Sequence, residues 1–240
     1  MPSVVILTCE HASNRVPKRW ARAFRGKESV LRTHRGYDLG AEDVAVRLAR
    51  LLDAPLLVGT ASRLVVDLNR SPSHPRLFSE FTRSLPGSER ALILRQVYAP
   101  HRAAVERAVR LSGSRGVTVV HVAIHSFTPV LNGVRRTADV GLLFDPARAR
   151  ESLLCRAWRA ALRDANGTLR VRLNYPYRGT SDGLTTALRR THDGASYLGV
   201  EVELGNEWIR TPQGAREAAE LLGATLPHVI ERAGHTEHVH

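Results

Sequence analysis

The stretch GVTVVHVAIHSF, residues 116–127, decides the fold of this chain. Its apolar and β-branched residues follow one another without the spacing of an amphipathic helix, and they form the strongest strand signal in the sequence. The strand ends in two chemically capable side chains, His125 and Ser126. On both sides of it, predicted strands and predicted helices alternate along the sequence.

Other short apolar runs predict further strands. They lie at residues 3–9, 55–60, 64–68, 137–145, 169–177 and 197–204. Helical spacing of apolar residues predicts helices between these strands. The predicted helices are residues 36–54, 88–111, 151–165 and 212–222 with an extension. Pro100 lies inside the second helix, and a break or kink is expected there because proline cannot donate the helical hydrogen bond.

The alternation of strands and helices predicts an α/β fold. We expect a single three-layer α/β/α domain over residues 1–240, with a mixed or mostly parallel central sheet and helices on both faces. The 240 residues are 43% hydrophobic, which is enough for a substantial core. Residues 233–240 are expected to form a mobile tail, and the histidines of GHTEHVH (234–240) to have no more than adventitious metal affinity.

The composition excludes several classes of protein. Thirty-five basic residues against 23 acidic ones give a net charge of +12, yet the arginines are spread along the chain without a basic block. We read them as solvated surface charge and expect no nucleic-acid partner. The two cysteines form no CxxC pair, so neither a disulfide framework nor a cysteine zinc cluster is expected. No apolar run has a membrane-spanning length, and the first residues have no basic segment before the first predicted strand. We therefore expect no signal peptide and a cytoplasmic enzyme without a membrane partner.

Polar side chains gather at the ends of the predicted strands. Ligands of open α/β sheets bind beyond the carboxyl ends of strands, so a site is expected there. His11 follows the first strand, DLNR (67–70) ends the stretch LVVDLNRSP, and His125 ends the central strand. Glu201 and Glu203 lie on one face of their strand, because side chains alternate with a period of two. Buried carboxylates are costly and need a partner or a chemical role.

These residue types together match the requirements of a catalytic zinc site. Two histidines and a carboxylate bind zinc and leave one position for water, whose pKa falls to about 7. A glutamate can then carry protons, an arginine can stabilise an oxyanion, and an asparagine–arginine pair can hold a substrate carboxylate. The sequence offers each part at or near a strand end: His11, His125, Glu203, Arg63, and Asn69 with Arg70.

Six motifs in this order resemble the N-formylglutamate amidohydrolase family over residues 4 to about 210. They are CEHASNRVP, HRGYDLGA, SRLVVDLNR, AIHSFTP, NYPYRG and VEVEL. DLNR also recurs in the more distant aspartoacylases and succinylglutamate desuccinylases. The resemblance implies the zinc-carboxypeptidase (phosphorylase/hydrolase-like) fold. It also implies a metal-dependent hydrolase that cleaves an N-acyl amino acid with a carboxylate, such as N-formylglutamate.

The resemblance also implies roles for individual residues. His11 and His125 would be ligands of one zinc ion per chain, and Glu203 the general base and acid. Arg63 would polarise the scissile carbonyl. The carboxylate of the substrate would bind Asn69 and Arg70, and Arg178 in NYPYRG would be either a second substrate anchor or a solvated turn residue.

The third metal ligand departs from the wider pattern. Carboxypeptidases and aspartoacylases carry a glutamate three residues after the first histidine, and here that position is Asn14. Asp38 in GYDLGA is our first choice for the third ligand, because the aspartate belongs to the formylglutamate-family pattern, and Glu10 is the second. Asp38 could instead only favour the N-terminus of the following helix.

Other readings of these residues remain open. Asp67 is expected to be structural and to pair with the backbone or Arg63. Glu201 could pair with Arg178 or another arginine. Ser126 beside a histidine would suit a serine hydrolase, but no GxSxG turn surrounds it.

Two other functions compete with the small-substrate amidohydrolase. The same motifs would serve a related zinc amidase or peptidase that acts on a larger N-acylated compound. The absent glutamate at Asn14 would also suit a non-catalytic relative that binds anions or nucleic acid through a damaged metal site. Neither the acyl group nor the oligomeric state follows from the sequence.

Overall fold

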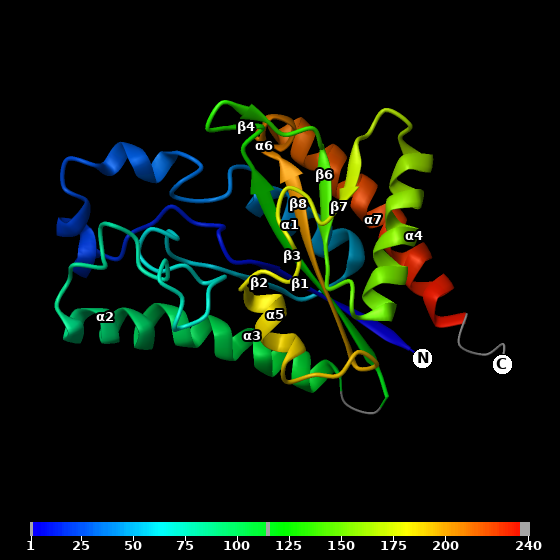
Figure 1. Cartoon of the computed structure of the whole chain (residues 1–240), viewed down its shortest axis with the longest axis horizontal. Helices are drawn as coiled ribbons and strands as arrows, with labels where there is room; N and C mark the ends of the chain where they lie inside the picture. Colours follow the sequence, from blue (N-terminus) through cyan, green and yellow to red (C-terminus); the bar gives the residue numbers. More distant parts are fainter. Residues whose placement is uncertain (1, 114–115, 236–240) are drawn as a thin grey trace.

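The computed structural model of this protein describes residues 2–113 and 116–235. Its centre is a six-stranded sheet with the strand order β2–β1–β3–β8–β6–β7 (Figure 1). The strands are β1 (Ser3–Cys9), β2 (Leu56–Val58), β3 (Thr118–Phe127), β6 (Val140–Leu143), β7 (Val171–Leu173) and β8 (Tyr197–Gly205). A separate hairpin consists of β4 (Val130–Leu131) and β5 (Val134–Arg135). The predicted central strand is therefore β3, between β1 and β8.

The sheet is mixed. Strands β2, β1, β3 and β8 are parallel to one another, whereas β6 runs antiparallel to β8 and pairs in parallel with β7. Because β1, β3 and β8 share one direction, their carboxyl ends lie at the same edge. This edge is where the predicted catalytic residues are found.

Helices cover both faces of the sheet, which confirms the three-layer architecture. On one face, α1 (Ala41–Leu52), α4 (Ala149–Ala165) and α7 (Pro212–His235) pack together over a core that includes Trp158. On the other face, α3 (Ala99–Ser112) and α5 (Leu184–Arg189) pack over a smaller apolar cluster. Figure 1 shows α4 and α7 to the right of the sheet and α3 below it.

The predicted strand at residues 64–68 is wrong. These residues form turns, and their apolar side chains belong to a second cluster beside the sheet. Leu64, Val65 and Val66 pack there among the elements η1 (Lys18–Phe24), η2 (Glu28–Arg32) and α2 (Gly87–Ile93). The pattern was apolar because the segment is buried in this cluster rather than because it pairs with other strands.

The predicted helix at 88–111 is interrupted close to Pro100, as expected. It consists of α2, a π-helical segment η3 (Leu94–Tyr98) and α3, and Pro100 lies in the first turn of α3. The π-helical turn η3 leads directly into α3 with helical backbone angles at Tyr98 and Ala99, so the proline is accommodated by a widened turn and does not end the helix.

Several strand ends differ from the prediction. The strand predicted at 169–177 is only β7, because Asn174 adopts a left-handed φ of 50° directly after it. Helix α7 continues through His235, and residues 236–240 of the predicted tail lie outside the described residues. The short helices η1, η2, α5 and α6 (Asn206–Ile209) were not predicted. Among the described residues, no helix is long and apolar enough to cross a membrane.

Candidate metal centre

The central residues of the site lie at the ends of three parallel strands, β1, β3 and β8. In the pairing of β3 with β8, His125 lies opposite Glu203. In the pairing of β1 with β3, Thr8 lies opposite Ala123, and the same register continued by two residues sets Glu10 beside His125. The carboxyl-terminal edge therefore gathers ionisable side chains from segments that are far apart in the sequence.

Two histidines and one aspartate converge at this edge. Nδ1 of His125 lies 3.0 Å from Oδ2 of Asp38, and Nδ1 of His11 lies 3.4 Å from the same oxygen. One donor atom from each of the three side chains lies within 4.8 Å of the other two. All three residues are at most 4% exposed. Two imidazole nitrogens and one carboxylate oxygen are the donor set of a three-ligand catalytic zinc site.

The second nitrogen of each histidine faces another carboxylate. Nε2 of His11 lies 2.7 Å from Oδ1 of Asp67, and Nε2 of His125 lies 3.0 Å from Oε2 of Glu10. Metal-binding histidines commonly give their other N–H to a carboxylate, which fixes the tautomer and the ring orientation. Glu10 contacts the nitrogen of His125 that does not face Asp38. This position fits an outer partner better than the alternative third ligand.

Asp38 reaches the site from the loop before α1. Its backbone N–H donates to the carbonyl of His11 at 2.9 Å, which ties this loop to the end of β1. Its Oδ2 also accepts the backbone N–H of Ser126 at 3.2 Å. The side chain is thus engaged with β1 and β3. These contacts show that Asp38 does more than favour the N-terminus of α1.

A turn centred on Asp67 explains the polar end of LVVDLNRSP. Arg63 donates from Nη1 to Oδ1 of Asp38 at 3.2 Å and from Nη2 to Oδ2 of Asp67 at 3.1 Å. Oδ1 of Asp67 also accepts the backbone N–H of Asn69 at 3.0 Å. Asp67 therefore pairs with both backbone and Arg63, as expected. Its contact with His11 was not anticipated.

The charges of the cluster favour a cation between the histidines. Burial alone would raise the pKa of the Asp38 carboxyl, but His11, His125 and Arg63 outweigh it and hold that pKa well below its ordinary value. Burial would lower the pKa of His125, but hydrogen bonds and charges from Asp38 and Glu10 raise it well above its ordinary value. A divalent cation would meet the same field of carboxylates.

The residues present fit a zinc ion. Nδ1 of His11 is buried and has no hydrogen-bond partner among the described residues, although it points to within 3.4 Å of Asp38. A buried polar atom without a partner is destabilising, and a metal bound at this nitrogen would satisfy it. Two imidazoles and a carboxylate suit zinc and also accept other first-row divalent ions.

Glu203 is a carboxyl group suited to carrying protons near neutral pH. It is 6% exposed, and its Oε2 has no hydrogen-bond partner among the described residues. Burial raises its pKa to about 7, against the opposing charge of His125 and with a further contribution from Asp38. A group with a pKa near the working pH can both accept and return a proton.

We expect the free energy of unfolding of the metal-free protein to fall, relative to that of a Glu203→Gln variant, as pH rises. The carboxyl ionises near 4.5 in the unfolded chain and near 7 in the folded one, so between these values the unfolded state is favoured. The full difference, present above about pH 7, is about 3 kcal/mol. Denaturant unfolding of both proteins at about pH 4 and about pH 8 measures it. A pH-independent difference would contradict the raised pKa.

All eight predicted site residues line one cavity of about 330 Å³. They are His11, Asp38, Arg63, Asn69, Arg70, His125, Arg178 and Glu203. Glu10 is absent from this lining. The cavity also includes residues that the sequence analysis missed: Arg76, Leu131, Tyr177, Ser181 and Asp182. Tyr177 stands in the motif NYPYRG beside Arg178, which could have indicated it. No sequence pattern connects the other four with the strand ends, because they lie in loops and in the β4–β5 hairpin.

Asn69 and Arg70 are held in place by contacts across the cavity. Oδ1 of Asn69 accepts the backbone N–H of Leu184 at 2.6 Å. Nη1 of Arg70 donates to the carbonyl of Asp182 at 3.0 Å. Each side chain has further N–H donors, so both can hold an anion without breaking these bonds.

The remaining candidates have other partners. Oε1 of Glu201 accepts the hydroxyl of Thr185 at 2.7 Å, and no ion pair with Arg178 or another arginine is present among the described residues. Asn14 lines a separate hollow beside Tyr37. The hydroxyl of Ser126 donates to the carbonyl of Leu39 at 3.0 Å. A serine that bonds a carbonyl in this way is not paired with a histidine base.

Replacing Ser126 by alanine is therefore expected to preserve amide hydrolysis. The variant loses one partly buried hydrogen bond and should be less stable by about 1 kcal/mol. Thermal unfolding and a hydrolysis assay on the same preparation check both parts. Loss of activity without loss of zinc would instead support a serine hydrolase with Ser126 as the nucleophile.

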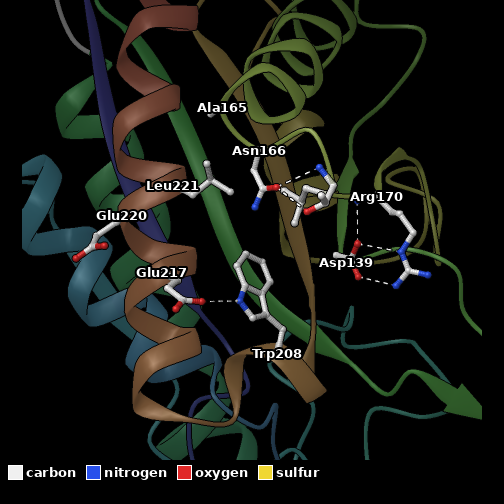
Figure 2. Close-up of a pocket in the computed structure, with 10 residues that line it drawn as sticks. Asp139, Ala165, Asn166, Arg170, Trp208, Glu217, Glu220 and Leu221 are labelled. Carbon is white, nitrogen blue, oxygen red and sulfur yellow. Dashed lines mark hydrogen bonds and ion pairs between the residues drawn. The ribbon is translucent and has the colours of Figure 1, made fainter.

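A larger hollow of about 740 Å³ lies away from this site. It is lined by the end of α4, the following loop, and residues of α6 and α7 (Figure 2). Its polar groups bond mainly with one another: Arg170 pairs with Asp139 at 2.6 Å, and Nε1 of Trp208 donates to Glu217 at 3.4 Å. None of the predicted site residues lines it, so we place the chemistry in the smaller cavity.

Comparison with known proteins gives a consistent result. The model of the N-formylglutamate amidohydrolase family matches residues 3–206. The crystal structure of a gene product from Agrobacterium tumefaciens is 30% identical, covers 97% of this chain and 92% of its own, and has a TM-score of 0.84. The N-formylglutamate amidohydrolase from Ralstonia eutropha is 18% identical, with coverage of 98% and 96% and a TM-score of 0.70, which supports the shared fold. None of the curated protein sequences matches this chain.

The three-layer fold and the family match together define an amide-cleaving hydrolase. Its ionisable residues lie where this fold class binds ligands, at the carboxyl ends of the strands. The family match extends over most of the chain, and the chain belongs to the N-formylglutamate amidohydrolase family. The resemblance carried by the six sequence motifs is confirmed.

Proposed function

We propose that this protein is a zinc-dependent amidohydrolase that releases the acyl group, such as formyl, from an N-acyl amino acid such as N-formylglutamate. His11, Asp38 and His125 would hold one zinc ion per chain, each through one donor atom. Bound there, zinc would supply a Lewis acid that polarises the acyl oxygen and lowers the pKa of a water molecule. The proposal rests on the family match together with the geometry of the buried cluster.

Glu203 is the proposed proton carrier. It accepts a proton from the attacking water while the water oxygen bonds to the acyl carbon. It then donates this proton to the amide nitrogen as the carbon–nitrogen bond breaks, so that a carboxylic acid and a free amine leave. The single observation that carries this role is the buried Oε2 of Glu203 next to His125, which has no hydrogen-bond partner among the described residues and belongs to a carboxyl with a pKa of about 7.

Arg63 is the proposed stabiliser of the charge that develops on the acyl oxygen. Two of its five N–H donors bond Asp38 and Asp67, and the side chain still lines the cavity. The two carboxylates raise its pKa further, although burial opposes them, so Arg63 stays charged. Asn69 and Arg70 are the proposed anchors of the substrate carboxylate, with Arg178 as a second anchor.

Glu10 and Asp67 are the proposed outer partners of the two histidine ligands. Each lies within 3.0 Å of the histidine nitrogen that faces away from Asp38. A carboxylate in this place keeps the other nitrogen deprotonated and directed at the metal.

The experiment that tests the proposal measures acyl release together with metal content. Purified protein loaded with zinc is incubated with N-formyl-L-glutamate, N-acetyl-L-glutamate and N-formyl-L-methionine, and formate or acetate and free amine are quantified. We expect about one zinc per chain and release from at least one formyl substrate. Protein that binds zinc but releases none of these acyl groups would point to another amide. Protein without zinc would overturn the metal assignment.

The size of the cavity favours a small substrate over the alternative larger one. About 330 Å³ is at the lower end of the range for small-molecule sites, and loops that carry Arg76 and Arg178 line it. A large N-acylated polymer would need a longer open cleft. We therefore propose an N-acyl amino acid rather than a peptide or cell-wall fragment.

A further inference from the structure

A row of buried polar side chains leads from the middle of the sheet towards the metal centre. The ring of His121, on β3, lies between Thr8 and Tyr197. Its Nε2 is 2.9 Å from Oγ1 of Thr8, and its Nδ1 is 2.7 Å from the hydroxyl oxygen of Tyr197. All three residues are completely buried. Polar groups this deep in a protein are costly unless each has a partner or a role, and the proposed reaction uses none of the three.

The row lies on the face of the sheet that α3 and α5 cover. Tyr197 packs there against apolar residues of both helices. Side chains alternate along a strand, so His121 and His125 share this face of β3, and Thr8 and Glu10 share it on β1. The buried polar row and the inner part of the metal centre are therefore continuous on one face of the sheet.

At one end, the row reaches Glu10, the proposed outer partner of His125. Both carboxylate oxygens of Glu10 are buried, and neither has a well-aligned hydrogen bond among the described residues. Burial alone would raise the pKa of this carboxyl, but His125 and a hydrogen bond from the Thr8 side chain help to hold that pKa below its ordinary value. The ring of His125 and the hydroxyl of Thr8 are thus the side-chain donors that face this carboxylate.

At the other end, packing fixes the hydroxyl of Tyr197 beside His121. A Cβ atom added at Gly199 would lie 2.9 Å from that hydroxyl oxygen, so the glycine leaves the space that the phenol occupies. The ring of His192 packs on the Tyr197 ring, with 5.7 Å between their centroids. Burial raises the pKa of Tyr197 well above its ordinary value, so the hydroxyl keeps its proton.

The two ends give the row a direction. Burial lowers the pKa of His121 to about 4, so at neutral pH its ring carries a single proton, on one of the two nitrogens. With that proton on Nε2, Tyr197 donates to Nδ1, the ring donates to Thr8, and the hydroxyl proton of Thr8 is left for Glu10. With the proton on Nδ1, Thr8 must donate to the ring, and Glu10 loses this donor. An ionised carboxylate can only accept, so Glu10 favours the first arrangement.

We propose that His121 is a positioning residue of the metal centre, acting through Thr8 and Glu10. The inference rests on the proposed function, in which His125 binds zinc and Glu10 is its outer partner. His121 does not line the cavity, and its role is to direct the Thr8 hydroxyl at the carboxylate of Glu10. A carboxylate held by this second donor keeps its place opposite Nε2 of His125, which leaves Nδ1 directed at the metal.

The first test replaces Thr8 by valine, which keeps the shape of the side chain and removes the hydroxyl. Thr225→Val is a matched control, because Thr225 is also buried and accepts the ring N–H of Trp158 at 2.9 Å, far from the cavity on α7. Each variant thus leaves one buried ring N–H without its acceptor. Zinc affinity is measured by competition with a chromophoric chelator, and denaturant unfolding of the metal-free proteins compares their stability.

We expect Thr8→Val to weaken zinc binding about 3- to 10-fold, less than the loss of an outer partner itself. Thr225→Val should lower stability by a similar amount and leave zinc affinity unchanged. Unchanged zinc affinity in Thr8→Val would overturn the inference. An equal loss of affinity in the control would also overturn it, because the threonine would then serve only the fold.

The second test needs no variant. Long-range ¹H–¹⁵N spectra of the wild type show which nitrogen of His121 carries the proton, and we expect a neutral ring protonated on Nε2. A ring protonated on Nδ1 would overturn the inference, because the hydroxyl of Thr8 would then donate to His121 and not to Glu10. Wild type that binds no zinc would instead contradict the metal centre of the proposed function, and this role would fall with it.

Discussion

Replacing Glu203 by glutamine is expected to reduce turnover by about 10²- to 10⁴-fold while zinc stays bound. Glutamine keeps the size of the side chain but can neither accept the proton of the attacking water nor deliver it to the leaving amine. Glu203 is not part of the cluster formed by His11, Asp38 and His125, so the metal should remain. The measurement is formate release on saturating substrate, with zinc content determined on the same sample.

Glu201 provides a matched control for this substitution. It lies two residues earlier on the same face of β8 and lines the same cavity, so Glu201→Gln removes the same charge from nearly the same place. Its Oε1 accepts the hydroxyl of Thr185, whereas Oε2 of Glu203 has no partner among the described residues. We expect Glu201→Gln to affect turnover far less. Comparable losses of turnover in the two variants would indicate that Glu203 contributes through its negative charge and does not carry a proton.

The strand-end argument located most of this site for a physical reason. In a parallel sheet, the carboxyl ends of strands must meet at one edge, whatever lies between them in the sequence. His11, His125 and Glu203 lie at the ends of β1, β3 and β8, which are adjacent in the sheet. The apolar runs and the rule for parallel strands therefore predicted that these residues lie at one edge of the sheet, and the strand order of the structure makes them neighbours.

The role of Asp67 was harder to predict because its segment has a misleading pattern. Leu64, Val65 and Val66 are as apolar as a buried strand, but they pack in the cluster beside the sheet. Periodicity reports burial and cannot tell which apolar surface is covered. The contact of Asp67 with His11 depends on this turn, so it could not be derived from an assumed strand end.

The outer partner Glu10 and the cavity residue Arg76 illustrate a second limit. The contact of Glu10 with His125 depends on the register between β1 and β3, which a single sequence does not specify. Arg76 lies in an irregular loop whose path depends on the bond between Leu77 and Asp67. In both cases the position of the side chain is set by contacts between residues far apart or by a loop bond, and local sequence pattern does not reveal it.

The third metal ligand can be identified by comparing Asp38→Asn with Glu10→Gln. Both substitutions keep the size of the side chain and remove one buried negative charge near His125. Asp38 shares the space between the two Nδ1 atoms, whereas Glu10 contacts Nε2 of His125. We expect Glu10→Gln to weaken zinc binding by about 10- to 100-fold, as is typical of an outer partner. Asp38→Asn should weaken it considerably more, because a ligand atom is lost.

Zinc affinity is measured by competition with a chromophoric chelator, and the unfolding of the metal-free proteins shows whether each variant still folds. Asp38 also bonds Arg63 and the backbone of Ser126, so some loss of stability is expected in Asp38→Asn independently of zinc. A larger loss of affinity in Glu10→Gln, with both variants folded, would mean that zinc binds through Nε2 of His125. The ligand set would then be shifted towards Glu10, and the positions of water, Arg63 and Glu203 in the proposed reaction would have to be derived again from that centre.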